Sequence, residues 1–305
     1  MPRLTIQLCT YNRARLLERV LEALFDQSVP DDAYEVVLVN DGSPDDTNAV
    51  IERVRALARC AFIVIEQANA GLAKGRNAGI ARSSGERICF IDDDVLPTPV
   101  FAAEHLASDE RHGDVIVRGA VINTESFDDL PPPVWSPLNY SGNYFWTSNV
   151  SVRRTRLDRA GGRFDDTFTE YGWEDIELGM RLRALGTRGV FNRYAVAFHH
   201  KPQPAGANVA GILRQVRAQA RTAVQLRAKH PHWRVDLAVG ATPPQRALGT
   251  LVHRSGIARL LAPLAGTRDE TRRLSPPQLL AAQVLATDAY YDELARAEAA
   301  AADTP

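Results

Sequence analysis

Strand-like and helix-like segments alternate regularly through the first hundred residues of this chain. Short runs rich in valine, isoleucine and leucine are separated by segments whose apolar residues recur with helical spacing. The expected strands are residues 4–9, 34–39, 61–65 and 87–91, and the expected helices are residues 13–26, 46–58 and 71–83. Strands that alternate with helices of this length predict βαβ units, right-handed crossovers and a mostly parallel sheet in the α/β class.

The composition is that of a soluble globular protein. Of 305 residues, 45% are hydrophobic and 24% are charged, and the formal net charge of -1 gives no argument for a nucleic-acid partner. The three cysteines lack metal-site spacing and suit buried thiols in a reducing compartment. No apolar run approaches the ~20 residues that span a bilayer. We therefore expect a cytoplasmic protein, at most peripheral to the cytoplasmic face of the membrane.

Ligands bind parallel sheets outside the carboxyl ends of the strands, so the residues directly after each strand carry the functional information. Three adjacent carboxylates, Asp92, Asp93 and Asp94, follow the fourth expected strand. Like charges this close repel one another unless a cation or a set of hydrogen-bond donors compensates them. The other strand ends contribute an aromatic ring, an acid, a hydroxyl and cations: Thr10, Tyr11, Arg13, Asp41, Lys74 and Arg76. Singly these residues are typical of turns and solvated faces, but together they suit a nucleotide diphosphate with a divalent metal.

Four motifs occur in a fixed order: CTYNRARLLERVLEAL, VLVNDGSPDDT, NAGLAKGRNAGI and CFIDDDVLP. They resemble the amino-terminal half of family two glycosyltransferases with the GT-A fold, and the match covers roughly residues 3–202. The resemblance implies a GT-A type, Rossmann-like, mostly parallel sheet with flanking helices. It also implies a catalytic domain over residues 1–204 and leaves a C-terminal helical region over residues 205–305.

The resemblance assigns a role to each strand end. Tyr11 stacks on the nucleobase, Asp41 accepts a hydrogen bond from it, and Arg76 helps to hold the nucleotide. The carboxylate triplet is the DxD-type motif, whose last member, Asp94, binds the metal. A hard divalent cation takes oxygen ligands and can bridge a carboxylate to both phosphates. The full expected donor site is Thr10, Tyr11, Arg13, Asp41, Lys74, Arg76, Asp92 and Asp93.

The sequence YGWEDIELGMRL at residues 171–182 places Glu174 and Asp175 at the start of an expected helix. Acidic residues there are often ordinary caps, and the helix dipole is expected to keep Asp175 ionised at neutral pH. The sequence also resembles the family's acceptor-site motif, which implies that Asp175 is the general base and Glu174 its close neighbour. A sugar hydroxyl is a weak nucleophile, and removing its proton during attack contributes ~10²- to 10⁴-fold in rate.

Aromatic side chains near this motif are the candidate acceptor contacts, because sugars present apolar C–H faces that pack on aromatic rings. The same side chains serve equally well as anchors of a hydrophobic core, and the sequence leaves both roles open. The candidates are Tyr144, Trp146 and Trp173.

Two histidines end the apolar run at residues 196–198. A lone histidine there is most often a hydrogen-bonded surface residue, but the resemblance implies a metal ligand at this point. We favour His199 over His200 because it is the first residue past the apolar run. An imidazole beside Asp94 favours Mn²⁺, although Mg²⁺ also fits.

The C-terminal region begins with a basic amphipathic pattern. Residues 201–235 carry seven lysines or arginines and no acidic residue, and their apolar residues recur with helical spacing. Such a helix can lie on anionic lipid, contact a lipid-linked diphosphate acceptor, or pack on the catalytic domain with its arginines in water. Residues 247–265 fit the same three interpretations, and residues 275–302 are expected to form a terminal helix.

These features predict an inverting glycosyltransferase. It moves a sugar from a nucleoside diphosphate sugar, with UDP favoured, to a hydroxyl of a carbohydrate or glycolipid acceptor in polysaccharide or glycoconjugate synthesis. The alternative is a catalytically silent nucleotide-sugar or glycan-binding module, which has no need of the pair Glu174 and Asp175. A Rossmann-type dehydrogenase is disfavoured because no GxGxxG follows the first expected strand.

Overall fold

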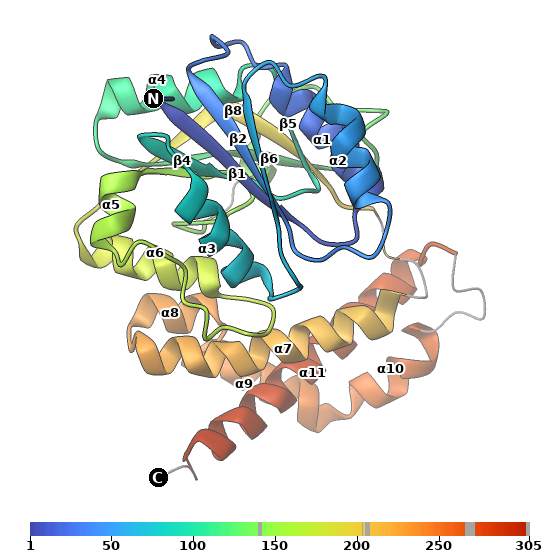
Figure 1. The fold of residues 1–305 in the computed structure, drawn as a ribbon. Helices are drawn as coiled ribbons and strands as arrows, with labels where there is room; N and C mark the ends of the chain where they lie inside the picture. Colours follow the sequence, from blue (N-terminus) through green and yellow to red (C-terminus); the bar gives the residue numbers. More distant parts are fainter. Residues whose placement is uncertain (140–141, 203, 205–207, 266–271, 303–305) are drawn as a thin grey trace. The chain divides into compact units, whose positions relative to one another are not determined.

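The computed structural model describes residues 1–139, 142–202, 204, 208–265 and 272–302 (Figure 1). Its internal contacts divide the chain into two compact units. Unit 1 comprises Met1–Thr167 and Glu174–Pro202, and unit 2 comprises Phe168–Trp173 and Gln203–Pro305. The sequence places the short segment Phe168–Trp173 inside residues 1–204, whereas its contacts group it with the C-terminal helices.

Unit 1 is built, within the described residues, on an eight-stranded sheet with the order β3-β2-β1-β4-β7-β6-β8-β5. The strands are β1 (Leu4–Thr10), β2 (Tyr34–Asn40), β3 (Ala61–Glu66), β4 (Arg87–Phe90), β5 (Val95–Pro97), β6 (Ile116–Thr124), β7 (Val150–Arg153) and β8 (Gly189–His200). The first four pair in parallel, which confirms the predicted sheet. Beyond them, β7 is antiparallel to both β4 and β6, and β6 is parallel to β8.

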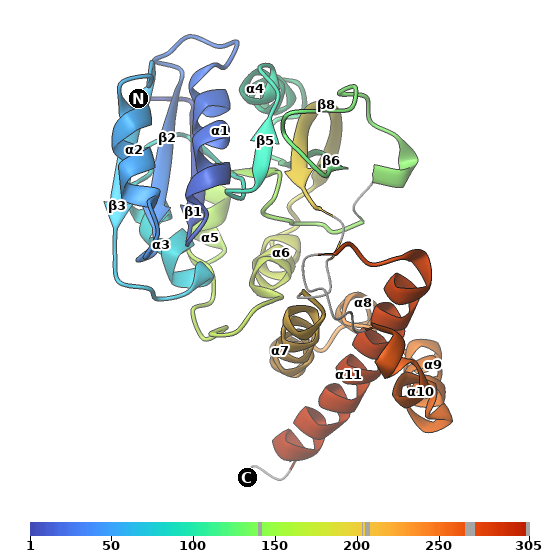
Figure 2. The same cartoon turned by 90° about the vertical axis from the view of Figure 1, so that its right-hand side faces the viewer.

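The helices of unit 1 bury apolar stripes against this sheet. They are α1 (Ala14–Phe25), α2 (Thr47–Arg55), α3 (Leu72–Arg82), α4 (Phe101–His112), α5 (Arg154–Arg159) and α6 (Glu174–Ala184), with a 3₁₀ turn at Pro137–Asn139. Figure 2 shows α1 and α2 beside the first three strands. In α1 the side chains of Leu17, Leu21 and Leu24 are fully buried, as their i, i+4 and i+7 spacing predicts. The fully buried β2, YEVVLVN, is the near-continuous apolar run expected of a central parallel strand.

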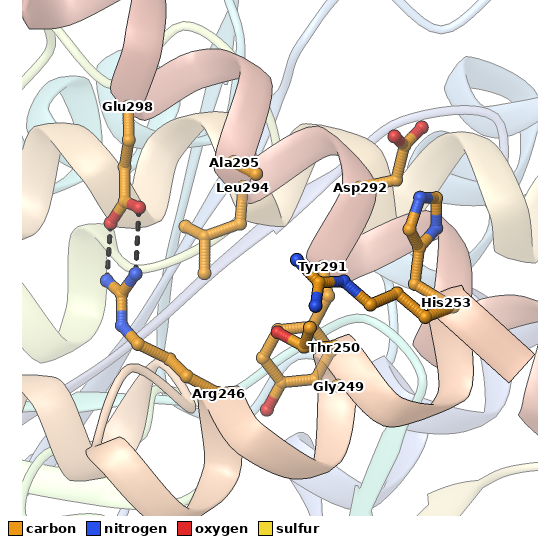
Figure 3. A pocket seen from close by; sticks show the side chains of 10 residues that line it. Arg246, Gly249, Thr250, His253, Tyr291, Asp292, Leu294, Ala295 and Glu298 are labelled. Atoms are coloured by element: carbon orange, nitrogen blue, oxygen red, sulfur yellow. Dashed lines mark hydrogen bonds and ion pairs between the residues drawn. The ribbon is translucent and has the colours of Figure 1, made fainter.

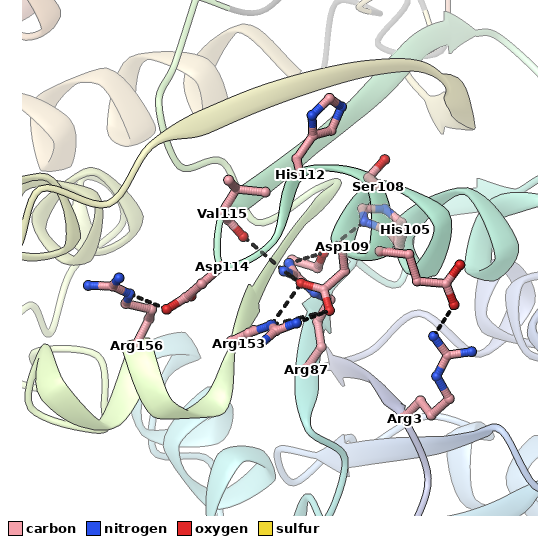
Figure 4. Close-up of polar contacts among 12 residues, drawn as sticks. Arg3, Arg87, His105, Ser108, Asp109, His112, Asp114, Val115, Arg153 and Arg156 are labelled. Carbon is pink, nitrogen blue, oxygen red and sulfur yellow. Dashed lines mark hydrogen bonds and ion pairs between the residues drawn. The ribbon is translucent and has the colours of Figure 1, made fainter.

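A cluster of charged side chains connects β4, β7 and α4 (Figure 4). It consists of Arg87, Asp109 and Arg153. The Arg87 side chain is only 1% exposed and donates to Asp109, to Ser151 Oγ at 3.0 Å and to the Val115 carbonyl at 2.9 Å. Arg153 approaches the second oxygen of the same Asp109 carboxylate at 2.8 Å. Burial lowers the pKa of the Arg87 guanidinium, because the charged form loses its hydration. The negative charge of Asp109 acts in the opposite direction and is the main group that stabilises the charged form.

Asp109→Ala should lower the free energy of unfolding by about 3 kcal/mol, because it leaves a buried guanidinium without its carboxylate. Urea denaturation followed by circular dichroism measures this loss. Asp128→Ala is the matched control, since Asp128 and its partner Arg19 are both largely exposed and such pairs contribute at most about 1 kcal/mol. Equal losses in the two variants would show that the Arg87 cluster does not stabilise the fold.

Unit 2 consists of helices around a long terminal helix, together with Phe168–Trp173. The helices are α7 (Asn208–Lys229), α8 (Trp233–Ala238), α9 (Pro243–Ser255), α10 (Ile257–Ala265) and α11 (Pro276–Ala302). The basic helix α7 contacts α11, and two of its arginines are paired within the unit: Arg221 with Glu293 at 2.7 Å, and Arg227 with Asp236 at 2.7 Å. Among the described helices, none combines the length and the apolar character needed to cross a membrane.

Candidate functional site

The acidic triplet lies at the carboxyl end of β4, directly beside the end of β1. Because the two strands pair in parallel, their ends meet at one edge of the sheet. The Thr10 hydroxyl donates to Asp93 Oδ2 at 2.8 Å, and the Arg13 guanidinium pairs with Asp94 and lies 3.6 Å from Asp93 Oδ1. Arg13 therefore supplies part of the positive charge that three adjacent carboxylates require.

Asp93 is the most deeply placed of the three carboxylates. Its side chain is buried, and burial raises its pKa to about 7, although Arg13 acts in the opposite direction. At neutral pH the triplet therefore carries less than three full negative charges, which reduces the repulsion within it.

Asp41 follows β2 and organises the loop that leads into α3. Its carboxylate accepts hydrogen bonds from the backbone N–H groups of Ala70 and Gly71 at 2.9 and 3.0 Å, and from Gln67 Nε2 at 2.6 Å. A carboxylate has about four lone-pair sites, so one remains for a nucleobase. The predicted base contact stays a prediction. Gly42 keeps this turn tight, since a Cβ there would lie 2.7 Å from the backbone nitrogen of Asn69.

Tyr11 and Lys74 flank the same edge. The Tyr11 ring is 50% exposed just past β1, which leaves it open for stacking, and Lys74 is exposed near the start of α3. Their assignment to the donor also stays a prediction.

Arg76 connects the donor edge to the predicted acceptor motif. The residue is 4% exposed, and its guanidinium donates to Glu174 Oε1 at 2.7 Å and to Asp92 Oδ1 at 3.1 Å. It also donates to the Thr147 hydroxyl at 2.6 Å. Its partners among the described residues are thus protein groups of the site itself, and a direct nucleotide contact stays a prediction.

Thr147 and Ser148 belong to this cluster, and sequence reasoning missed them. The Ser148 hydroxyl donates to Asp92 Oδ2 at 2.5 Å, so Asp92 is held by Arg76 on one oxygen and Ser148 on the other. Both residues are buried and precede β7, the strand beside β4. Only the sheet order could have revealed their position, because nothing local in the sequence marks them.

Asp175 is partly buried at the start of α6, where its Oδ1 accepts the backbone N–H of Ile176 at 2.6 Å. Burial, followed by the adjacent charge of Glu174, raises the pKa of Asp175 to about 7, against a smaller lowering by Arg76. Loss of hydration thus acts against the helix dipole, which was expected to keep this carboxylate ionised at neutral pH.

The three aromatic candidates have different surroundings. Tyr144 donates its hydroxyl to the Thr187 carbonyl, and the Arg183 guanidinium lies over its ring, 3.8 Å from the ring centre, so one face of the ring is already covered. Trp146 is half-buried just before Thr147. Trp173 belongs to unit 2, where its indole N–H donates to the Gln219 carbonyl of α7 at 2.8 Å. Its backbone adopts a φ of 73°, which is rare for a bulky residue. Acceptor contacts by these residues stay predictions.

His199 and Asp94 can share one metal ion. His199 Nε2 lies 3.8 Å from Asp94 Oδ1, and atoms this far apart can each lie ~2 Å from a single cation. The other ring nitrogen, Nδ1, is 3.2 Å from Asn123 Oδ1, which leaves Nε2 free to act as a ligand. The His200 ring instead packs on Phe127, with ring centres 5.6 Å apart. The geometry favours His199 over His200.

The protein supplies few metal ligands by itself. Within the part of the chain that the structure describes, no group of three or more His, Cys, Asp or Glu side chains forms a metal site. A carboxylate oxygen with an imidazole nitrogen nevertheless fits Mn²⁺ or Mg²⁺ when phosphate oxygens and water complete the coordination.

A family model and relatives of known name match more than half of this chain. A family model described as Glycosyl transferase family 2 matches residues 5–162. "Validoxylamine A glucosyltransferase" from Streptomyces hygroscopicus subsp. jinggangensis (strain 5008) is 30% identical over 223 residues, covering 61% of this chain and 52% of the relative. "Probable glycosyltransferase YdaM" from Bacillus subtilis (strain 168) is 25% identical over 221 residues, covering 67% and 52%. The chain spans about half the length of these relatives.

Solved structures share the fold. The crystal structure of S. aureus TarS 1-349 aligns with this chain with a TM-score of 0.59 at 16% sequence identity. The alignment covers 100% of this chain and 92% of the TarS chain. The mannosyltransferase PcManGT from Pyrobaculum calidifontis, solved with GDP-Man and Mn²⁺, has a TM-score of 0.54 at 20% identity, with coverage of 100% and 76%. At these identities the likeness shows the fold alone. The family match spans more than half of the chain, and the protein therefore belongs to Glycosyl transferase family 2, with the GT-A fold that its motifs predicted.

Proposed function

We propose that the protein is an inverting glycosyltransferase that moves a sugar from a nucleoside diphosphate sugar, with UDP favoured, to a hydroxyl of a carbohydrate or glycolipid acceptor. The observation that carries the proposal is the Arg76 bridge, which holds Asp92 of the donor edge and Glu174 of the base motif in one buried cluster. A pure binding module has no need to couple these two motifs. The similar proteins also support the proposal. One relative is named a glucosyltransferase, and the structural neighbour TarS was solved with UDP and with UDP-GlcNAc.

The chemistry follows from the residues of the cluster. Asp175 takes the proton of the acceptor hydroxyl, and a pKa near neutrality suits a general base. The hydroxyl oxygen then attacks the anomeric carbon from the face opposite the diphosphate, which inverts the configuration there. Arg76 keeps Glu174 paired, so that the second acid of the motif does not compete for the proton.

Asp94 and His199 would hold a divalent cation, Mn²⁺ or Mg²⁺. When bound, such an ion supplies positive charge that stabilises the departing diphosphate. PcManGT and GalNAc-T7, two structural neighbours, were both solved with Mn²⁺.

Two further assignments belong to this proposal. We place the catalytic domain at residues 1–204 and a C-terminal helical region at residues 205–305. We place the enzyme in the cytoplasm, at most peripheral to the cytoplasmic face of the membrane. A formal net charge of -1 gives no reason to expect a nucleic-acid partner.

Incubating the purified chain with a panel of nucleotide sugars and measuring diphosphate release tests the function. Release that rises with an added carbohydrate or glycolipid acceptor is the expected result, and the anomeric configuration of the product reports inversion. Tight binding of a nucleotide sugar without release, across the panel and with acceptors present, would instead identify a silent binding module.

Arg76→Met should move the pH dependence of transfer to higher pH. The Arg76 charge lowers the pKa of Asp175, so its removal should raise that pKa from about 7, and a higher pH is then needed to deprotonate the base. A pH profile of kcat/KM measures the shift. Arg76→Lys retains a charge and should shift less. Folded Arg76→Met protein with the wild-type midpoint would show that the bridge does not act on the base.

A further inference from the structure

Helices α9 and α10 leave an apolar surface uncovered. Five large apolar side chains within residues 248–264 are exposed. They are Leu248, Leu251, Ile257, Leu260 and Leu264. Leu260 is 78% exposed, Leu251 66% and Leu248 61%. Single exposed leucines are ordinary, but five on two consecutive helices form a patch of the kind that marks an interaction site. We call these five residues the leucine surface.

The leucine surface points away from the interior of unit 2. The opposite face of α9, with Arg246, Gly249 and His253, lines a pocket of about 250 Å³ against Tyr291 and Glu298 of α11 (Figure 3). Gly249 allows this approach, since a Cβ there would lie 2.3 Å from the Tyr291 ring. Because α9 is held on α11 through that face, Leu248 and Leu251 lie on its outer side.

In α10 the inner side is equally clear. Ala258 and Ala265 are buried, and Leu261 packs against a cluster that includes Ala281 of α11. The exposed residues 257, 260 and 264 recur at i, i+3 and i+7, which places them on one stripe. Both helices thus use α11 as their inner support. A single glycine, Gly256, joins the two helices, so the two exposed stripes follow each other directly along the chain.

Charge decides which occupant fits this surface. Residues 237–265 contain no aspartate or glutamate. Arg259 is exposed next to Leu260 and has no ion-pair partner among the described residues. Arg254 instead lines the pocket on the inner face of α9, together with His253 and Asp292. The arginines of α7 that the sequence suggested for lipid contact include Arg221 and Arg227, which are already paired inside the unit. An unpaired cation next to exposed leucines, in a segment without acidic residues, suits an anionic, partly apolar partner.

We propose that the leucine surface docks unit 2 on an anionic membrane, with its leucines in the interfacial region and Arg259 at the lipid headgroups. The helices have 13 and 9 residues, too short to cross ~30 Å of hydrocarbon, so they lie along the interface. A second copy of the chain fits less well, because a symmetric contact brings Arg259 of both copies to a segment that has no carboxylate of its own. Membrane attachment would bring the proposed enzyme to a lipid-linked acceptor, but the docking does not depend on the catalytic chemistry.

Co-sedimentation of the full chain with vesicles tests the proposal without any activity measurement. Vesicles of phosphatidylcholine mixed with phosphatidylglycerol should bind the protein at least ~10-fold better than phosphatidylcholine alone, and rising salt should weaken the binding. The double variant Leu251→Glu with Leu260→Glu should lose ~10-fold or more in binding. Arg259→Gln should reduce the preference for the anionic vesicles.

The matched control is Leu57→Glu, which replaces a leucine of unit 1 that is 52% exposed, and it should bind as the wild type does. Circular dichroism confirms that each variant is folded. Wild-type binding in the Leu251 and Leu260 variant, or no binding of the wild type to either vesicle, overturns the proposal. So does a concentration-dependent dimer that this double variant abolishes, since that result assigns the surface to a second copy.

Discussion

Asp175→Asn should lower kcat by ~10²-fold or more while donor affinity changes by less than ~3-fold. Asparagine keeps the shape of the side chain and can still accept the backbone N–H of Ile176, but it cannot take a proton from the acceptor. The measurement pairs a turnover assay, run with an acceptor found in the panel, with a donor titration by calorimetry. The loss should appear in chemistry and not in binding.

Asp46→Asn is the control, because it also alters a carboxylate at a helix start, at an exposed position before α2. It should leave kcat nearly unchanged. Wild-type turnover in Asp175→Asn would shift the role of base to Glu174. A collapse of donor affinity together with turnover would mean that Asp175 is a structural carboxylate.

The pH profile gives an independent test of the same residue. A general base acts in its deprotonated form, and burial raises the pKa of Asp175 to about 7. Transfer should therefore be weak at pH 5, rise through about pH 7 and level off above it. A profile of kcat/KM that is flat between pH 5 and 8 would contradict both the raised pKa of Asp175 and its role as general base.

Asp94→Ala should remove the metal-dependent part of nucleotide binding, lowering the affinity for UDP in the presence of Mn²⁺ by ~100-fold. Asp94 offers one oxygen to His199 Nε2 across 3.8 Å and pairs through the other with Arg13. Calorimetry with UDP, with and without Mn²⁺, measures the difference. Binding without metal should change far less, because Tyr11 and Asp41 remain.

His199→Ala should weaken metal-dependent binding by a smaller factor, and His200→Ala should leave it near the wild-type value. An effect confined to His200→Ala would reverse the assignment of the imidazole. Equal affinities of wild type and Asp94→Ala in the presence of Mn²⁺ would remove the acidic triplet from the metal site.

Local sequence patterns were enough to predict the parallel half of the sheet and the residues at its edge. Apolar runs of strand length alternating with amphipathic segments are local patterns, and the parallel pairing of β1 to β4 follows from them. The proximity of Thr10 and Arg13 to the acidic triplet follows in turn, because the ends of neighbouring parallel strands must meet. The motifs also named the family correctly.

The way in which the donor and base motifs meet depends on the packing of the whole chain. The antiparallel placement of β7 against β4 brings Thr147 and Ser148 to Arg76 and Asp92, residues 56 to 71 positions away along the chain. The raised pKa of Asp175 is likewise a consequence of burial, which no local pattern reports. The grouping of Phe168–Trp173 with unit 2 rests on contacts with α7, such as the Trp173 bond to Gln219. Strand order, burial and long-range ion pairs are properties of the packed chain, because each depends on neighbours that sequence distance does not fix.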